Sequence, residues 1–421
     1  MSGGWRWAGS VLLLALVMAG CQEQLTSPAD CPGLCPGGTA KVYDSIVPAL
    51  ADRDSSFPTF AQQGIGYVDR GKGTALLVSN GFAASEDRAF YRFDARIDSV
   101  KVRDTLRAFT VDSVSLGLTL VARDTLVNGL KIFLYRMPQT APTDTALTFA
   151  DVDPLLTDAN LIDSIPVPDS VNAGAISAVL RGADVAKVAL TPGGDSVLAI
   201  GVGIAADSPT GVRLGSVVAS TAASFVTYVT VDVPDTGSIR NQVINRGTVF
   251  NTFVTQTPIV PVDSLLTVGG EPSSRALVRF GLSNAFLDSA TIVRATLELV
   301  PVRPIIGLPT DPSFFQVISV LGDLGAKSPL TSDPSLIRQD TLPAVQSDTL
   351  RLDITTIVKA WRSNRSRPQS VFLRLAPEAA TFARAAFFST RSHVNIATGV
   401  DTTVAPRLRI TYQRPFPFES P

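Results

Sequence analysis

Short apolar segments rich in Val, Leu, Phe and Thr follow one another along most of the chain. Gly, Pro and Asp-Ser pairs separate them at intervals of about eight to fifteen residues. Segments this short, bounded by turn residues, are typical of antiparallel strands, whereas βαβ units need longer helical stretches between their strands. The pattern therefore predicts an all-β chain built from antiparallel β-sandwiches.

The strand-like segments of the first half recur in the same order in the second half. Residues 87–94 (DRAFYRFD) resemble residues 274–281 (SRALVRFG), and residues 225–231 (FVTYVTV) resemble residues 406–412 (PRLRITY). Four further pairs keep the same order: 75–79 with 264–268, 112–120 with 290–300, 131–135 with 314–318, and 195–202 with 369–375. A repeat of this period indicates an internal duplication.

Two tandem β-sandwich domains are expected from this repeat, over residues 56–236 and 237–413. The boundary is placed at the turn-forming sequence Pro-Asp-Thr-Gly of residues 234–237. Residues 414–421 are expected to form a C-terminal tail.

One short helix is expected in each domain. In residues 353–362, Asp353 can cap the helix by accepting backbone N–H groups of its first turn. Four apolar side chains follow at the i, i+3, i+4 and i+7 positions of one helix face, namely Ile354, Ile357, Val358 and Trp361. This spacing predicts that Trp361 lies in the core. Residues 175–181 are the corresponding candidate in the first half.

The N-terminus has the pattern of a bacterial lipoprotein signal peptide. Residues 11–20 form an apolar run that is too short to span a membrane, and the small residues Ala19 and Gly20 precede Cys21. We expect residues 1–20 to be removed and Cys21 to be acylated, so that the chain is held to a membrane by its N-terminal lipid. An ordinary signal peptide cleaved near Ala19 is the alternative.

This signal places the protein in the bacterial cell envelope. Gln22 follows Cys21 in place of the aspartate associated with inner-membrane retention, which favours the outer membrane. Residues 21–55 are rich in Pro, Gly, Ser, Thr and Asp, and we expect them to form a flexible tether. Cys31 and Cys35 lie in this tether and could form a small disulfide loop in an oxidising compartment.

Charge and composition exclude several other classes of protein. The formal net charge is −1, and the Lys and Arg residues are scattered, which argues against a nucleic-acid partner. His393 is the only histidine, so neither a familiar zinc site nor a Ser-His-Asp triad with a G-x-S-x-G motif can be assembled. We therefore expect no catalytic residues and no enzymatic activity.

The second half resembles DNRLRE-type domains. The motifs that carry the resemblance are an Arg-x-Leu-x-Arg-Phe-like strand at 275–280, an Ala-Thr-Leu-x-Leu strand at 295–299, a Leu-Asp-Ile-Thr-x-Ile-Val-x-Ala-Trp helix at 352–361, a Phe-x-Ser segment at 387–389 and a Pro-x-Leu-x-Ile-Thr-Tyr strand at 406–412. The resemblance spans residues 240–413 and implies a jelly-roll-like β-sandwich of a secreted or surface protein. Some such domains bind acidic polysaccharides.

Two sets of residues are candidate ligand sites. Arg362, Arg365 and Arg367 follow the predicted helix, and their guanidinium groups could pair with the carboxylates of uronic acids, although a solvated loop is the simpler interpretation. Three carboxylates within eight residues, Asp151, Asp153 and Asp158, could hold a structural calcium ion, although they lack the spacing of an EF-hand loop. No other cofactor is expected.

These observations leave two classes of function open. A non-catalytic protein that binds a polysaccharide or another cell-surface component should carry a groove lined by Arg and Asp on one face of a sandwich. A structural or adhesive surface protein should instead present flat apolar sheet surface or unprotected edge strands to an envelope protein.

Overall fold

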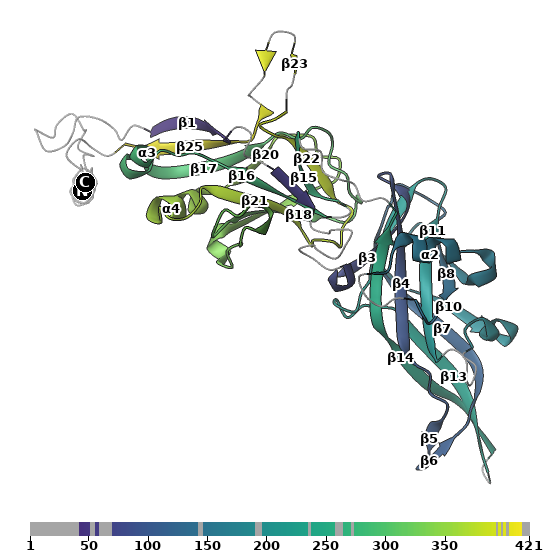
Figure 1. Cartoon of the computed structure of the whole chain (residues 1–421). Helices are drawn as coiled ribbons and strands as arrows, with labels where there is room; N and C mark the ends of the chain where they lie inside the picture. The colour runs from purple at the N-terminus through teal and green to yellow at the C-terminus, as the bar shows by residue number, and fades with distance from the viewer. Residues whose placement is uncertain are drawn as a thin grey trace, which may run out of the picture.

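The computed structural model describes residues 42–50, 55–58, 70–141, 146–189, 196–234, 237–256, 264–270, 273–392, 395–396, 399–400 and 404–414. These residues form antiparallel sheets with a few short helices, so the prediction of an all-β fold is confirmed. The strands form two bodies, each with its own core (Figure 1).

The first body is a ten-stranded sheet that curls around its core. Its strands are β3 (Ala75–Phe82), β4 (Ser85–Ala95), β7 (Thr110–Arg123), β8 (Lys131–Met137), β9 (Leu161–Pro166), β10 (Gly174–Arg181), β11 (Val197–Ala205), β12 (Thr210–Gly215), β13 (Ser224–Val233) and β14 (Gly237–Thr255). The sheet order is β14-β13-β7-β12-β3-β4-β11-β8-β9, with β10 paired to β7. The short pair β5 (Val100–Val102) and β6 (Thr105–Arg107) projects from one end (Figure 1).

The helices of the first body are short. They are α2 (Phe149–Val152) and the 3₁₀ helices η2 (Arg70–Lys72), η3 (Asp153–Leu155), η4 (Asp158–Asn160) and η5 (Gly182–Lys187).

The second body is a sandwich of two sheets. A seven-stranded sheet contains β2 (Ser55–Pro58), β15 (Leu265–Gly269), β16 (Ser274–Arg279), β18 (Ser313–Ser319), β19 (Ile337–Leu342), β21 (Ser370–Ala376) and β22 (Arg384–Phe388). A four-stranded sheet contains β1 (Val42–Pro48), β17 (Thr291–Leu299), β20 (Leu350–Asp353) and β25 (Arg407–Gln413).

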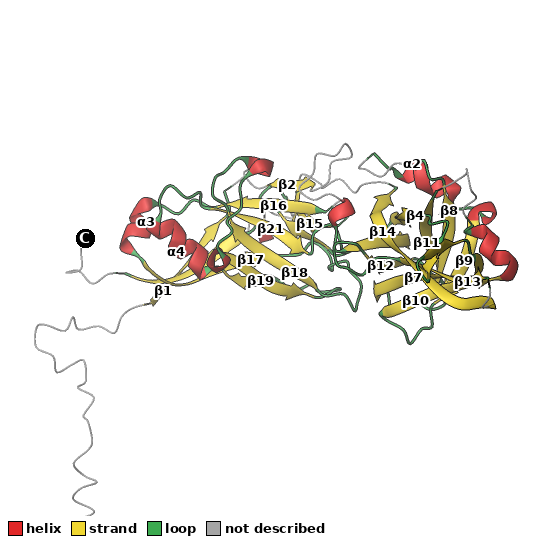
Figure 2. Ribbon diagram, turned by 90° about the horizontal axis from the view of Figure 1, so that it is seen from below, coloured by secondary structure: helices red, strands yellow, loops and turns green. Residues whose placement is uncertain are grey.

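The second body also contains two α-helices, which lie at one end of the sandwich (Figure 2). These are α3 (Asn284–Ser289) and α4 (Thr355–Ser363); the minor elements are η6 (Gly325–Lys327), η7 (Pro334–Leu336), β23 (Asn395–Ile396) and β24 (Gly399–Val400). The face of α4 predicted to be apolar is buried, and Trp361 is 1% exposed, so its predicted core position is confirmed.

The two bodies have the same strand order. The run β12-β3-β4-β11-β8-β9 of the first body corresponds to β22-β15-β16-β21-β18-β19 of the second. In the same way, β10-β7-β13-β14 corresponds to β20-β17-β25-β1. Every repeated segment of the sequence therefore lies in the same place in its own body.

The first strands of the two repeats are exchanged between the bodies. β1 precedes the first body in the chain but pairs with β25 of the second, where Ile46 lies opposite Arg409. β14 precedes the second body but pairs with β13 of the first, where Val243 lies opposite Tyr228. Arg409 and Tyr228 are matching positions of the sequence repeat, so β1 and β14 occupy equivalent places.

The exchange extends to a second contact. β2 pairs with β16, with Phe57 opposite Arg275, and the end of β14 pairs with β4, with Val254 opposite Arg88. Val254 follows Phe57 by 197 residues, the same interval that separates Val243 from Ile46. We call β1 with β2 one arm and β14 the other arm. Each arm makes two strand pairings, and the register of both pairings is the same in the two arms.

Two boundaries predicted from the sequence differ from the structure. Residues 237–255 belong to the first body, not to the second, and residues 42–48 of the predicted tether form a strand of the second body. Both differences have one cause: an unpaired sheet edge exposes backbone N–H and C=O groups, and the arriving arm supplies their partners.

The helix predicted at residues 175–181 is wrong. These residues form strand β10, in which Ala178 and Leu180 are buried while Val179 between them is exposed. Pairing with β7 imposes this two-residue period on a segment too short for periodicity alone to decide. The equivalent of α4 is the next element, η5.

The two bodies contact each other through a small mixed interface. Phe382 and Leu308 of the second body are buried in the core of the first, where the Phe382 ring packs edge-on against Phe82 at 5.2 Å between centroids. Beside them, Arg213 of β12 pairs with Asp311, and both side chains are 9% exposed. Burial raises the pKa of Asp311 despite the opposing charge of Arg213, so its loss of water is not fully compensated.

Removing one member of this pair should destabilise the protein strongly. We expect Asp311→Ala to cost about 3–5 kcal/mol, because Arg213 would be left buried and uncompensated. The double variant Arg213→Met/Asp311→Leu should cost less than the single one. Chemical denaturation of all three proteins measures this, with Lys101→Ala at an exposed pair expected to cost at most about 1 kcal/mol. A double variant at least as unstable as Asp311→Ala would contradict the analysis.

Candidate functional site

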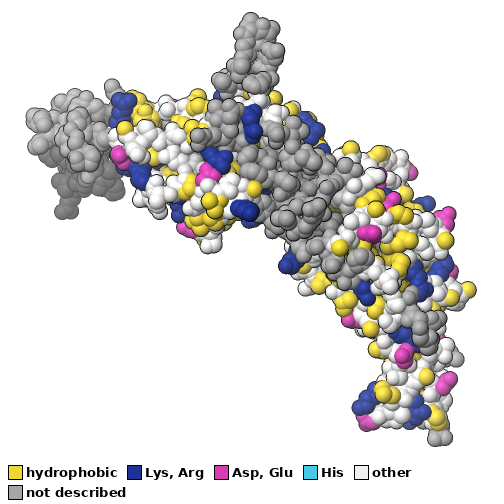
Figure 3. Space-filling view, in the orientation of Figure 1, with side chains coloured by type: hydrophobic (Ala, Val, Ile, Leu, Met, Phe, Trp, Pro, Cys, Tyr) yellow, Lys and Arg dark blue, Asp and Glu magenta, His cyan; other side chains and the backbone are white. Residues whose placement is uncertain are grey.

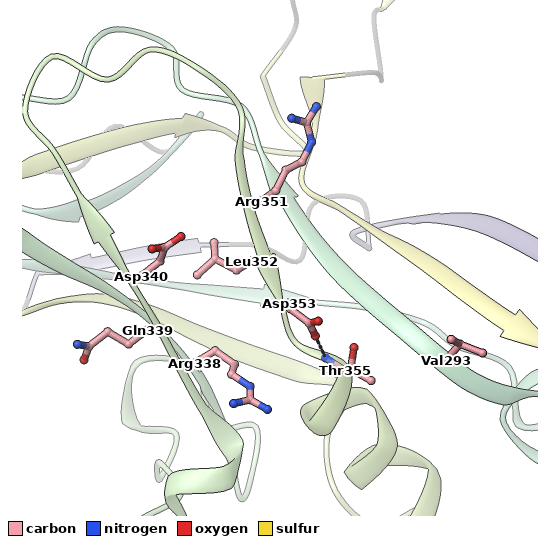
Figure 4. A pocket seen from close by; sticks show the side chains of 8 residues that line it. All are labelled: Val293, Arg338, Gln339, Asp340, Arg351, Leu352, Asp353 and Thr355. Atoms are coloured by element: carbon pink, nitrogen blue, oxygen red, sulfur yellow. Dashed lines mark hydrogen bonds between the residues drawn. The ribbon is translucent and has the colours of Figure 1, made fainter.

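A polar cleft of about 480 Å³ lies along the open edge of the second body. There β19, the last strand of one sheet, lies beside β20, the last strand of the other. The residues that line it are Val293 from β17, Arg338, Gln339 and Asp340 from β19, Arg351, Leu352 and Asp353 from β20, and Thr355 from α4 (Figure 4).

The chain places these side chains together because β19 and β20 follow each other directly along the sequence. Residues 343–349 carry the chain from the edge of one sheet to the edge of the other. Each strand contributes an Arg-x-Asp tripeptide, at residues 338–340 and 351–353. In a strand, the first and third residues of such a tripeptide point to the same face. Each tripeptide therefore presents one arginine and one aspartate on the same side of its own strand, and all four residues line the cleft.

The two arginines retain hydrogen-bonding capacity. Arg351 is 64% exposed as a side chain, and its only close carboxylate among the described residues is Glu298, 3.4 Å from its Nε. Arg338 donates from Nη2 to Thr356 Oγ1, while its Nε is buried and has no partner among the described residues. Arg351 is the more exposed of the two and is open to an acceptor from solvent.

The carboxylates accept backbone hydrogen bonds on one side. Asp353 Oδ1 accepts from the N–H of Thr355 at 2.9 Å, and Asp340 Oδ1 accepts from the N–H of Thr341 at 2.8 Å. Burial alone would raise the pKa of Asp353. The hydrogen bonds from Thr355 and the charges of Arg294 and Arg338 outweigh it and hold this pKa below its usual range.

Asp353 lies one position before the N-cap of α4, whereas the sequence predicts that it is the N-cap itself. Ile354 is the N-cap residue of α4, and the carboxylate of Asp353 one position earlier accepts the N–H of Thr355. Asp353 therefore serves the first turn of α4 as expected, and the same side chain borders the cleft.

Of the three arginines predicted as a ligand site, Arg362 lies in the last turn of α4, while Arg365 and Arg367 follow the helix, and none of them lines the cleft. Arg365 pairs with Asp288 of α3, Arg367 donates from Nη1 to Ser319 Oγ at 3.3 Å, and Arg362 is half-buried. Two of the three therefore hold neighbouring elements of the second body in place.

The three aspartates predicted as a calcium site are not brought together. Asp151 forms a capping box with Thr148, and Asp153 pairs with Arg88 at 2.9 Å, while Asp158 begins η4. The three carboxylates lie in three different short helices, α2, η3 and η4. Within the described ranges, no group of three or more His, Cys, Asp or Glu side chains could hold a metal ion.

The predicted lipidation site Cys21 and the possible disulfide pair Cys31 and Cys35 lie outside the described residues, as does His393. Among the helices that the structure describes, none has the length and apolar character needed to cross a membrane. No protein-family model matches this chain, and no curated protein matches it either. The cleft must therefore be interpreted from its own geometry.

The cleft was not found by sequence reasoning, although the sequence contains a signal for it. One Arg-x-Asp tripeptide lies on each side of residues 343–349. Strand alternation places the Arg and the Asp of each tripeptide on one face of their own strand. What the sequence does not show is that these two strands are the edges of opposite sheets.

Replacing Asp353 should give a pH-dependent loss of stability. Its folded-state pKa is lowered, so its contribution is present above the unfolded pKa of about 3.9 and is lost as the pH falls through the lower folded value. We expect Asp353→Ala to cost about 1 kcal/mol at pH 7. Melting curves from pH 7 to pH 3 should show its deficit shrinking with acidification. A deficit that grows towards pH 3 would contradict this prediction.

Proposed function

We propose that this protein is a non-catalytic envelope lipoprotein that binds an acidic polysaccharide in the cleft between β19 and β20. The observation that carries the proposal is the open row of Arg338, Arg351, Asp340 and Asp353, with Gln339 beside them. The cleft has the Arg and Asp composition expected of a sugar-binding groove, but it lies at the edge of the sandwich rather than across one face, and at different residues from those predicted.

The chemistry of the cleft suits uronic acids better than neutral sugars. Guanidinium groups bind carboxylates through charge-assisted hydrogen bonds, which are about twice as strong as neutral ones. The carboxylates of Asp340 and Asp353 and the amide of Gln339 can accept hydrogen bonds from sugar hydroxyl groups. The cleft is open along the sandwich edge, so a polymer could enter without a free chain end.

The protonation of the cleft favours binding over catalysis. A general acid that cleaves a glycosidic bond needs a carboxyl group with a raised pKa. Asp353 has a lowered pKa and is held by a backbone N–H, so it remains an ionised acceptor at neutral pH. On the face in Figure 3, Lys and Arg are scattered among Asp and Glu, which also disfavours a nucleic-acid partner.

The resemblance of the second half to DNRLRE-type domains supports the same proposal. Such domains occur in surface proteins, some of which bind acidic polysaccharides. The shared strand order of the two bodies supports an internal duplication.

An anchor at Cys21 would place the second body nearest the membrane. β1 begins at Val42 and is a strand of that body. The 20 intervening residues give 21 Cα–Cα steps, which span at most about 75 Å when fully extended. The first body would therefore lie farther from the membrane than the second, and Gln22 after Cys21 favours the outer membrane as the site of the anchor.

A structural or adhesive role is the second candidate, and the outer edge of β1 supports it. β1 is the last strand of its sheet, and it exposes Val42, Tyr43 and Ile46, of which Val42 is 55% and Ile46 54% exposed. An extended segment of another envelope protein could add to this edge as a further strand.

Retention on uronic-acid polymers tests the proposal. The mature chain should bind one such polymer, and Arg351→Ala should weaken binding about tenfold, because one charge-assisted contact is lost. Arg365→Ala is the matched control outside the cleft and should bind like the wild type. Affinity electrophoresis with and without calcium measures both.

Two outcomes would overturn the proposal. Binding lost with Arg365→Ala but kept with Arg351→Ala would move the site to the loop after α4. No retention on any acidic polymer would favour the structural role, for which crosslinking in the native envelope should capture a partner at β1.

A further inference from the structure

A second cavity, of about 200 Å³, lies at one end of the first body and is separate from the cleft. It opens between the sheet formed by β7, β13 and β14 and the segment that includes η5. Its lining is largely apolar: Ile97, Phe109, Val111, Val114, Val185, Val188, Ala189, Phe225 and Ile244, together with Arg96, Thr227 and Arg246.

Arg246 is the unusual feature of this cavity. Its guanidinium group lies over the ring of Phe225, with Cζ 3.9 Å from the ring centroid. Nη2 lies 3.5 Å from Thr227 Oγ1, at the limit of a hydrogen bond. Nε and Nη1 are buried and have no hydrogen-bond partner among the described residues. A buried donor without a partner costs about 1–3 kcal/mol, and a charged one costs more.

The surroundings do not compensate the charge of Arg246. Burial, together with the nearby positive charge of Arg96, lowers its pKa to about 10, and the carboxylate of Asp94 offsets only part of this effect. That carboxylate accepts the N–H of Gly247 at 3.3 Å. The cavity therefore presents a cation that an incoming anion would stabilise.

At the equivalent place in the second body, the described residues pack into the core. There α4 takes the position of η5 and inserts Trp361, which packs against Phe280 with ring centroids 6.2 Å apart. Ala49, which follows the arm strand β1, takes the position that Arg246 occupies in β14. Leu287, Ala290 and Ile292 complete a closed core. The same arrangement of strands is therefore filled by the Trp361 indole in the second body, whereas in the first body it contains a cavity lined by Arg246.

We propose that this cavity binds a small monocarboxylate with one compact apolar group, its carboxylate directed to Arg246. An apolar cavity of about 150 Å³ admits benzene, so 200 Å³ suits a single ring or a short branched chain next to a carboxylate. Drug-sized ligands need about 300–1,000 Å³. A single negative charge matches the one uncompensated cation, whereas a doubly charged phosphate would bring excess charge into apolar surroundings.

Binding of 4-fluorophenylacetate by the mature chain tests the proposal. The fluorine NMR signal of the probe should broaden with the wild-type protein, and unlabelled phenylacetate should reverse the broadening. Arg246→Met keeps the apolar stem over Phe225 and removes the charge, so it should weaken binding about tenfold or more. Ala189→Trp at the mouth should also abolish binding. Arg181→Gln, an exposed arginine outside the lining, is the control and should bind normally.

The neutral analogue 4-fluorobenzyl alcohol separates charge recognition from apolar burial. It should bind at least tenfold more weakly than the carboxylate to the wild type, and equally weakly to Arg246→Met. Equal binding of acid and alcohol by the wild type would overturn the proposal. So would absence of broadening, or full binding by Arg246→Met. The melting temperatures of the variants verify that each one is folded.

Discussion

The pairing of sheet edges is the constraint on which the rest of this structure depends. Each body has one edge strand, β13 or β25, whose outer backbone groups its own run of strands leaves without partners. The arm that precedes the other body covers that edge: β14 covers β13, and β1 covers β25. The exchange joins the first and the last described strands, β1 and β25, in one sheet. It also means that neither body is complete from one continuous repeat.

The position of the strands could be predicted from the sequence, but their partners could not. Alternating apolar residues locate β4, β13 and β25, because each of these strands buries mainly one face. The arm strands β1 and β14 also look like strands in the sequence, but the sequence does not indicate which body each of them joins. Residues 42–48 expose most of their side chains and therefore resemble a tether, since their stability comes from backbone pairing with β25.

The candidate sites show the same limit. The burial of Trp361 could be predicted, since it depends on helical spacing along one short segment. The cleft could not, because Arg338 and Arg351 meet only where the edges of two different sheets lie side by side. Arg365 and Asp153 carry suitable chemistry for binding, but each has a neighbouring side chain of opposite charge as its partner. Residue type suggests a site, and tertiary partners decide whether it remains available.

The two bodies share one strand order but carry different candidate sites. The second body fills its end with Trp361 and carries charged residues at its open edge, while the first body has a cavity where Arg246 is uncompensated. Disulfide trapping at Asp44 and Thr411, which lie opposite each other with Thr411 Oγ1 2.6 Å from Asp44 Oδ1, tests the exchange most directly. With the native cysteines replaced by serine, Asp44→Cys/Thr411→Cys should form an intramolecular disulfide in the monomer, and Asp44→Cys/Thr230→Cys should not. Crosslinking of position 44 to position 230, the matching residue of the first body, would contradict the exchange.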